Sequence, residues 1–338
     1  MDNITHTLTA MALSQAGLNR KTRFATLALV VGANLPDVDL LSRLGGPLTY
    51  LRYHRGIAHS ILGVTVLAAL LAGALLYLGR KFPTAKKNVP PLDTRWLFAI
   101  CWIATTSNLL LDFTNSYGVR PFLPFSNRGY AGDIMFIFDP LLLGLLILGL
   151  GIPWLLRLIS EEVGAEKPPM RRGAIFALVG LVLLLGLRDL AHRRVVQLLD
   201  SRTYYQENPQ EVAAFPTPSN PFSWVGVVET ASAFHVLPVS ALASEVNPER
   251  LRVFHKPEPS PALEAAMQTR TARIFASFAR FLWVRVEESE DGYTATLCDL
   301  RYATPDLERP MFTAAIELNK NLTVRSESCS VSGQPPEH

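Results

Sequence analysis

The stretch that decides the fold is residues 53–78, YHRGIAHSILGVTVLAALLAGALLYL, in which a polar loop with two histidines leads into a long apolar run. From Ile57 to Leu78 only His59, Ser60 and Thr65 are polar, so the segment is long and apolar enough to cross a bilayer as a helix. Ionisable side chains at membrane depth are costly and indicate a functional site, and imidazole is the commonest protein metal ligand. The alternative is a capped helix start with one buried, hydrogen-bonded histidine.

The composition divides the chain into a membrane part and a soluble part. Of its 338 residues 49% are hydrophobic, and the mean hydropathy of +0.20 is too high for an ordinary pair of soluble domains. We therefore expect an all-α multi-pass membrane helical bundle over residues 1–195, followed by a small α+β soluble domain over residues 200–331. The net charge of +3 is small and its basic residues are mixed with acids, so no nucleic-acid partner is expected.

Four further apolar segments and one more polar helix complete the predicted bundle. Residues 3–17 predict a helix too polar to face lipid, and Phe24–Leu35 rises only about 18 Å, so these two are expected to pack as a hairpin inside the bundle. The other three predicted segments are Trp96–Leu111, Ile134–Leu156 and Ala174–Leu187.

The basic residues predict the topology. If each apolar segment crosses, twelve basic residues fall on one face and five on the other, which favours the first face as cytoplasmic. The twelve are Arg20, Lys21, Arg23, Arg80, Lys81, Lys86, Lys87, Arg95, Arg157, Lys167, Arg171 and Arg172; the five are Arg43, Arg52, Arg55, Arg120 and Arg128. An inner (plasma) membrane protein is expected, with its C-terminal domain on the extracytoplasmic side.

The C-terminal half predicts a small α+β domain after a loop-rich connector over Pro209–Pro221. The expected elements are strands at Trp224–Thr230 and Ala233–Val239, an amphipathic helix at Ala262–Arg280, and two hairpins formed by Phe281–Glu288 with Tyr293–Tyr302 and by Phe312–Leu318 with Leu322–Ser326. Its cysteines form no zinc motif, and Cys298 and Cys329 would pair only in an oxidising compartment.

Histidines and carboxylates gather at the ends of the predicted helices on one membrane face. The clusters are Asp2 with His6, Asp37 with Asp39, His54 with His59, Asp112 with Asn115, and Asp133 with Asp139. On an ideal helix Asn108, Asp112 and Asn115 project within about 100° of one another and share one face, whereas His54 and His59 project about 140° apart. Both histidines can reach one point only if His54 lies in the loop and Gly56 bends the chain.

Each cluster also has a structural interpretation. Asp37, Asp39 and Asp139 lie beside prolines and could cap helices, and Asp112 could pair with Arg55 or Arg120. Five independent caps on one face would be a coincidence, so the joint interpretation as one site is favoured.

A mixed set of histidine and aspartate ligands without thiolates suits zinc or another divalent ion such as manganese. A metal bound in this way activates water and polarises a phosphoryl or carbonyl oxygen, which is the chemistry of a hydrolase. The sequence contains no Gly-x-Ser-x-Gly, Walker loop or His-Glu-x-x-His, which disfavours serine hydrolases, nucleotide-loop proteins and zincins.

These motifs resemble the inner-membrane metal-dependent hydrolases described as LexA-binding, inner membrane-associated hydrolases. The matching motifs are Asp2-x-x-Thr5-His6, Asn34-Leu35-Pro36-Asp37-x-Asp39, His54-Arg55-Gly56-x-x-His59-Ser60, Asp112-x-x-Asn115-x-x-Gly118 and Asp133 through Asp139-Pro140. The resemblance covers about residues 1–190. It implies a helical membrane bundle, a metal site and a distant likeness to zinc-dependent phospholipases C. LexA binding is not carried over, because the predicted site faces away from the cytoplasm.

Together these observations predict a membrane-bound metal-dependent hydrolase acting on a phosphoester or lipid headgroup at the extracytoplasmic face. The expected metal ligands are His6, Asp37, His54, His59 and Asp112; the expected catalytic or orienting residues are Asp39, Asn115 and Asp133, with Arg55 holding a phosphate oxygen. The expected partners are membrane lipid and a small-molecule or lipid substrate. The alternatives are a non-catalytic membrane scaffold, or a transporter with an intramembrane proton relay.

Overall fold

The computed structural model describes residues 1–84, 89–164, 166, 169–302 and 311–331. Lys86, Lys87 and Lys167, which contribute to the predicted topology, lie outside these ranges.

The chain forms two compact units, each built from separate stretches of sequence. The helical unit comprises Met1–Asp39 and Arg55–Asp189, and the mixed unit comprises Leu40–His54 and Leu190–His338. The break at Asp189 lies close to the division expected from composition. The segment Leu40–His54 belongs by its contacts to the mixed unit, although it is flanked on both sides by the helical unit.

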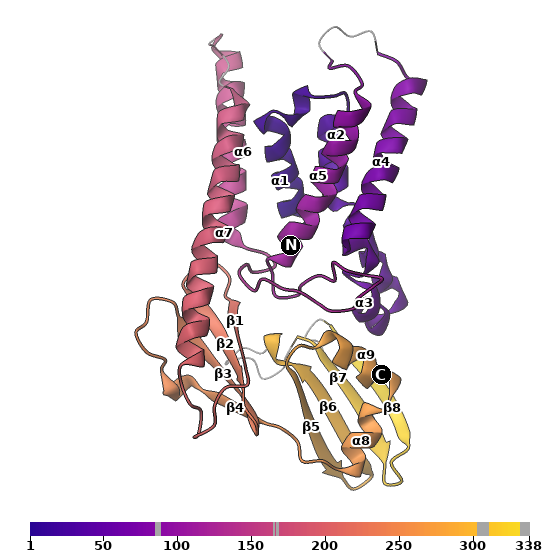
Figure 1. The fold of residues 1–338 in the computed structure, drawn as a ribbon, viewed down its shortest axis with the longest axis vertical. Helices are drawn as coiled ribbons and strands as arrows, with labels where there is room; N and C mark the ends of the chain where they lie inside the picture. Colours follow the sequence, from indigo (N-terminus) through magenta and orange to yellow (C-terminus); the bar gives the residue numbers. More distant parts are fainter. Residues whose placement is uncertain (85–88, 165, 167–168, 303–310, 332–338) are drawn as a thin grey trace. The chain divides into compact units, whose positions relative to one another are not determined.

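The N-terminal half is helical, and five of its segments are long and apolar enough to cross a membrane (Figure 1). The elements are α1 (Asn3–Ala16), η1 (Leu18–Arg20), α2 (Ala25–Asn34), η2 (Pro36–Gly45), η3 (Ile57–His59), α4 (Ile61–Lys81), α5 (Thr94–Phe113), α6 (Pro140–Glu162) and α7 (Met170–Asp200). The candidate spans are Ala25–Gly45, α4, α5, α6 and α7. The predicted multi-pass helical bundle is confirmed.

Small side chains allow α1, α2, α4 and α5 to pack closely. Seven of the buried residues in their shared core are alanines: Ala10, Ala25, Ala28, Ala33, Ala68, Ala72 and Ala104. A Cβ added at Gly32 would lie 2.7 Å from the Cβ of Ala104, so α2 and α5 meet at backbone distance there. Such close packing is typical of membrane helices, which gain little from hydrophobic burial against each other.

Polar residues cap the N-termini of four helices in this half. Asp2 accepts a hydrogen bond from the backbone of α1, Ser60 from that of α4, Asp93 from that of α5, and Asp139 from two amides of α6. The predicted cap at Asp139, with proline following, is therefore confirmed. Ahead of α4 the turn η3 folds back closely, since a Cβ added at Gly63 would lie 1.8 Å from the carbonyl oxygen of Ile57.

Two predicted helix boundaries are wrong. The segment expected from Ile134 becomes helical only at Pro140, because the amides of Ile134 and Met135 bond to the carbonyl of Thr114 and tie this stretch to the end of α5. The last apolar segment extends far beyond Ala174–Leu187, since α7 continues to Asp200 as an amphipathic helix.

The mixed unit holds two four-stranded antiparallel sheets, each in sequence order (Figure 1). The first contains β1 (Glu211–Pro216), β2 (Ser223–Glu229), β3 (Ala233–Ser240) and β4 (Arg252–His255); the second contains β5 (Leu282–Ser289), β6 (Gly292–Asp299), β7 (Thr313–Asn319) and β8 (Val324–Ser330). The remaining elements are α3 (Pro47–Tyr53), η4 (Pro248–Arg250), α8 (Pro261–Met267), α9 (Arg270–Phe278) and η5 (Leu300–Tyr302). The predicted α+β class is confirmed.

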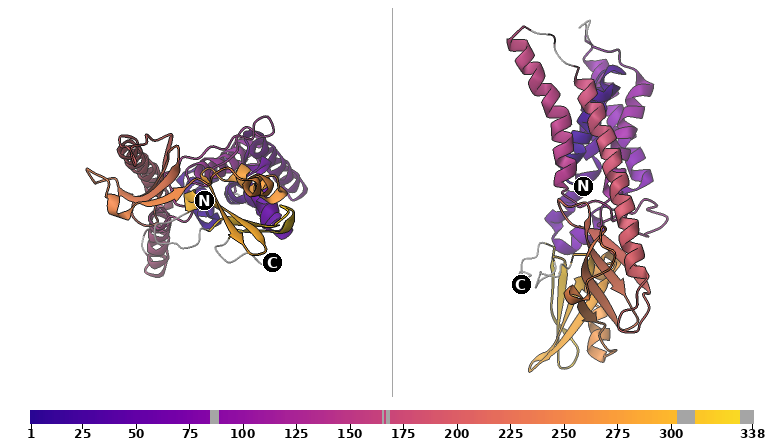
Figure 2. Two further views of the ribbon diagram at one scale, coloured as in Figure 1. Left: turned by 90° about the horizontal axis from the view of Figure 1, so that it is seen from below. Right: turned by 90° about the vertical axis from the view of Figure 1, so that its left-hand side faces the viewer.

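The C-terminal part of α7 lies along the first sheet, as both views show (Figures 1 and 2). Its buried residues Ala191, Val195 and Leu199 share a core with Trp224 and Leu237 of the sheet. This packing explains why the helix continues past the apolar segment.

Local details of the mixed unit differ from expectation. The predicted connector contains β1, and the helix expected from Ala262 to Arg280 is two helices, because Thr269 ends the first and caps α9 through the amide of Ala272. The two predicted hairpins are present as β5–β6 and β7–β8. Cys298 and Cys329 are both free thiols.

Candidate metal site

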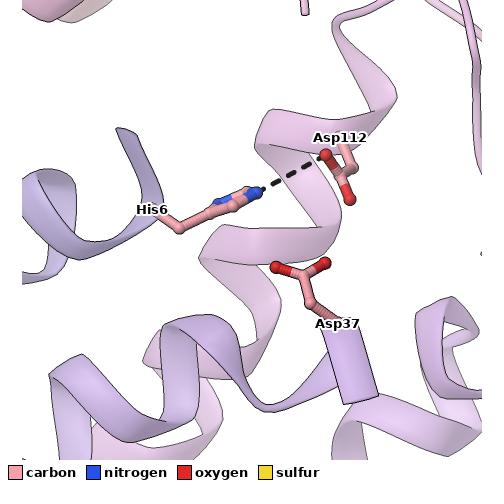
Figure 3. A group of neighbouring side chains, drawn as sticks. All are labelled: His6, Asp37 and Asp112. Carbon is pink, nitrogen blue, oxygen red and sulfur yellow. Dashed lines mark ion pairs between the residues drawn. The ribbon is translucent and has the colours of Figure 1, made fainter. Parts of the chain in front are cut away.

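Three side chains from three separate elements converge inside the helical unit. His6 comes from α1, Asp37 from η2 and Asp112 from the last turn of α5, and one potential ligand atom from each lies within 4.8 Å of the others (Figure 3). All three are buried, with 1%, 8% and 0% of their surfaces exposed. Burial of two carboxylates so close together requires a compensating positive charge.

His59 lies against the same group. Its Nε2 is 3.2 Å from Asp37 Oδ1 and 3.1 Å from Asp112 Oδ2, while its Nδ1 is 2.9 Å from Asp39 Oδ2. Metal-bound histidines usually hold their second nitrogen against a carboxylate in this way. His59 therefore contacts two members of this group through Nε2, and Asp39 orients its ring through Nδ1.

The distances between these atoms are short. Bonds of about 2.0–2.1 Å to a tetrahedral zinc place its ligand atoms about 3.3–3.4 Å from each other. His6 Nε2 lies 3.5 Å from Asp112 Oδ1, whereas His59 Nε2 lies 3.2 Å from Asp37 Oδ1 and 3.1 Å from the other Asp112 oxygen, Oδ2. Both ring nitrogens of His6 are buried and accept or donate no hydrogen bond among the residues that the structure describes.

The two histidines differ in protonation. Burial lowers the pKa of His6 to about 3, helped by the positive charges of the Met1 amino group and Arg55, so its ring is neutral and has a lone pair for a cation. Burial also lowers the pKa of His59, but hydrogen bonds to Asp37 and Asp39 outweigh it and raise this pKa above its ordinary value. A metal ion would therefore displace a proton from His59.

Arg55 covers the outer side of Asp112. Its Nη2 donates to Asp112 Oδ1 at 2.8 Å, and its Nη1 donates to Asn115 Oδ1 at 2.7 Å and to the carbonyl of Gly118 at 3.3 Å. The Met1 amino group also pairs with Asp112. Asn115 thus lies beside the group of ligands, bound to Arg55.

His54 and Asp133 are placed differently. His54 follows α3 in the mixed unit and stacks on Tyr50 with 4.5 Å between ring centroids. Asp133 is buried in the loop before α6 with a left-handed φ of 56°. The chain turns over residues 54–56, with the bend at Gly56 (φ −85°, ψ −131°) that the sequence predicted and a left-handed φ of 50° at Arg55.

Two further residues contribute to this region. Asn108, which the sequence places on the Asp112 face of α5 but not among the predicted site residues, donates from Nδ2 to Asp37 Oδ2 at 3.3 Å. Arg188 of α7 donates to Asp139 Oδ2 at 2.5 Å, and both side chains are fully buried. Nothing in the local sequence of α7 pairs these two residues, which are 49 positions apart.

Comparisons with known proteins agree with this division. Residues 1–195 match the family model described as YdjM inner membrane protein, and residues 261–332 match the YfhP C-terminal alpha/beta plait domain. The chain is 26% identical over 341 residues to the uncharacterized protein YfhP of Bacillus subtilis (strain 168), covering 96% of this chain and 94% of that relative. No solved structure matches the chain. Because the first model covers more than half of the sequence, the chain belongs to the YdjM inner membrane protein family.

Proposed function

We propose that this membrane protein is a metal-dependent hydrolase that binds one divalent cation between His6, Asp37 and Asp112, with His59 as the fourth ligand. The observation that carries the proposal is the convergence of buried side chains from α1, η2 and α5, whose potential ligand atoms lie within 4.8 Å of one another, with His59 Nε2 3.2 Å from Asp37 and 3.1 Å from Asp112. Nitrogen and oxygen donors without thiolates favour zinc, with manganese as the second choice.

The ion would supply an activated water and would polarise an oxygen of the substrate. Asp39 would hold the His59 ring in place through Nδ1. Asp133, a buried carboxylate outside the ligand set, is the candidate general base, and Asn115 would act through its hydrogen bond with Arg55.

A phosphoester or lipid headgroup at the extracytoplasmic face is the proposed substrate class. His59 lies two residues before α4 begins, and Asp112 lies one residue before α5 ends. Ends of apolar helices lie near the headgroup region of a bilayer, and the distribution of basic residues predicts that these ends face outward.

The test is a metal analysis of the purified protein in mild detergent, followed by a screen against phosphoesters that include a lipid phosphate. We expect about one zinc per chain, loss of that zinc in His6→Ala and His59→Ala, and hydrolysis that a chelator abolishes. His255→Ala, at an exposed position of β4, is the matched control and should retain the metal. Absence of metal from the wild type would refute the proposal, and bound metal without any hydrolysis would favour a non-catalytic scaffold.

A further inference from the structure

Arg55 directs its donors into the protein. Its side chain is buried, with 5% of the residue exposed, and its terminal nitrogens donate to Asp112, Asn115 and the carbonyl of Gly118. The guanidinium also lies over the ring of Tyr117, with 4.9 Å to the ring centroid. A substrate phosphate could bind these terminal nitrogens only by displacing partners that already form a closed set at the end of α5.

The backbone conformation of Arg55 is unusual for a residue with a side chain. It takes a left-handed φ of 50°, a conformation that costs free energy in a residue with a Cβ and persists only where surrounding contacts fix it. The contacts of the guanidinium with the end of α5 supply that restraint. The sequence therefore keeps a large cationic residue where glycine would be the easier choice.

The contacts of Asp112 divide between its two oxygens. Oδ1 accepts the hydrogen bond from Arg55 Nη2 at 2.8 Å, pairs with the Met1 amino group and lies 3.5 Å from Nε2 of His6, while Oδ2 lies 3.1 Å from Nε2 of His59. A carboxylate held through one oxygen presents the other in a fixed direction. The surrounding charge is negative, since the three carboxylates of Asp37, Asp39 and Asp112 outnumber the one guanidinium, and such an excess favours a cation.

From these contacts we infer that Arg55 is a positioning residue of the metal site: it orients Asp112 and the end of α5 toward the ion, and it does not bind the phosphate of the substrate. This inference rests on the proposed function. It replaces the phosphate-binding role that the sequence suggested for this residue.

The test measures metal and phosphate binding separately. Co²⁺ is titrated into detergent-purified wild type, Arg55→Lys and Arg55→Gln, and its visible absorption reports both affinity and ligand geometry. We expect a 10–100-fold weaker Kd for Co²⁺ in Arg55→Gln, a smaller loss in Arg55→Lys, and an altered Co²⁺ spectrum in both. The affinity of the Co²⁺-loaded protein for inorganic phosphate should change by less than about twofold, since Arg55 would make no phosphate contact.

Arg128→Lys is the matched control, because Arg128 is exposed and stacks on Tyr130. If the Arg55 variants do not fold, Asn115→Ser removes one acceptor of the guanidinium and should give the same changes in milder form. Unchanged Co²⁺ affinity with weakened phosphate binding would overturn the positioning role alone. A wild-type protein that binds no Co²⁺ would instead overturn the proposed function from which this role follows.

Discussion

Replacing Asp39 with asparagine should weaken metal binding without removing a ligand. Asp39 Oδ2 lies 2.9 Å from Nδ1 of His59, and this carboxylate both orients the ring and increases the basicity of its other nitrogen. Loss of such a partner typically costs 10–100-fold in metal affinity, which corresponds to about 1.4–2.8 kcal/mol. The amide oxygen of the substituted side chain could still accept a hydrogen bond, so the fold should persist.

The size of this loss should depend on pH. Burial lowers the pKa of His59, but the hydrogen bonds to Asp37 and Asp39 outweigh burial and raise it. Protons therefore compete with the metal for His59 in the wild type, and the affinity of the protein for the metal falls about tenfold for each pH unit below that pKa. Removing the Asp39 carboxylate lowers the pKa of His59 and so weakens this competition in the variant. The difference between wild type and variant should therefore be largest at high pH and shrink as the pH falls.

Competition titrations with a coloured zinc chelator between about pH 6 and pH 9 would measure both effects. Asp93→Asn is the matched control: Asp93 caps the opposite end of α5 through the amide of Trp96, and asparagine caps equally well. A deficit of the same size at every pH would show that Asp39 acts only on the fold. Equal affinities at high pH would refute the proposed contact between Asp39 and a metal-bound His59.

Three other changes test separate features. Arg188→Met should leave the buried Asp139 carboxylate without its cation and cost about 3–5 kcal/mol of stability, measured as a lower Tm in detergent. Adding Asp139→Asn to this variant should recover part of the lost stability. Additive losses in the double variant would contradict the pairing of Arg188 with Asp139. Gly63→Ala should push away the turn before α4, where a Cβ would lie 1.8 Å from a carbonyl oxygen, and reduce zinc content while helix content measured by circular dichroism is retained. Hydrogen bonds, chiefly from the Thr230 side chain, lower the pKa of Glu207 to about 2. The stabilisation that the Glu207 carboxylate gives to the folded protein is therefore present above its ordinary pKa of 4.5 and is lost as the pH falls toward 2. Glu207→Gln should be less stable than wild type at pH 7, and the unfolding curves of the two proteins should converge at acidic pH.

The parts of the fold that depend on local composition were predictable. An uninterrupted apolar run specifies α4 with little ambiguity, and proline after Asp139 specifies the start of α6. The β1 strand was hidden because prolines surround its apolar residues and suggested a loop. The break before α9 had a visible signal in Thr269, a good N-cap residue, but the periodicity of the surrounding segment favoured one continuous helix.

The residues of the candidate site could be predicted from the sequence, but only some of the contacts between them could. The polar clusters at helix ends correctly identified His6, Asp37 and Asp112 as neighbours. His54 belongs by its contacts to the mixed unit, and no local pattern in the sequence encodes that assignment. The partner of Asp139 is set by packing between α6 and α7, where a Cβ at Gly173 would lie 2.2 Å from the carbonyl of Gly149.

The placement of Leu40–His54 in the mixed unit has a consequence for biogenesis. Its helix α3 packs against α9 and β8, and α9 begins at Arg270, more than 200 residues later in synthesis. At roughly 5–20 residues per second the ribosome needs about 10–40 s to produce that distance. Throughout this interval the segment that joins Asp39 to Arg55 lacks its packing partners, so α3 is expected to dock only after α9 and β8 have been synthesised.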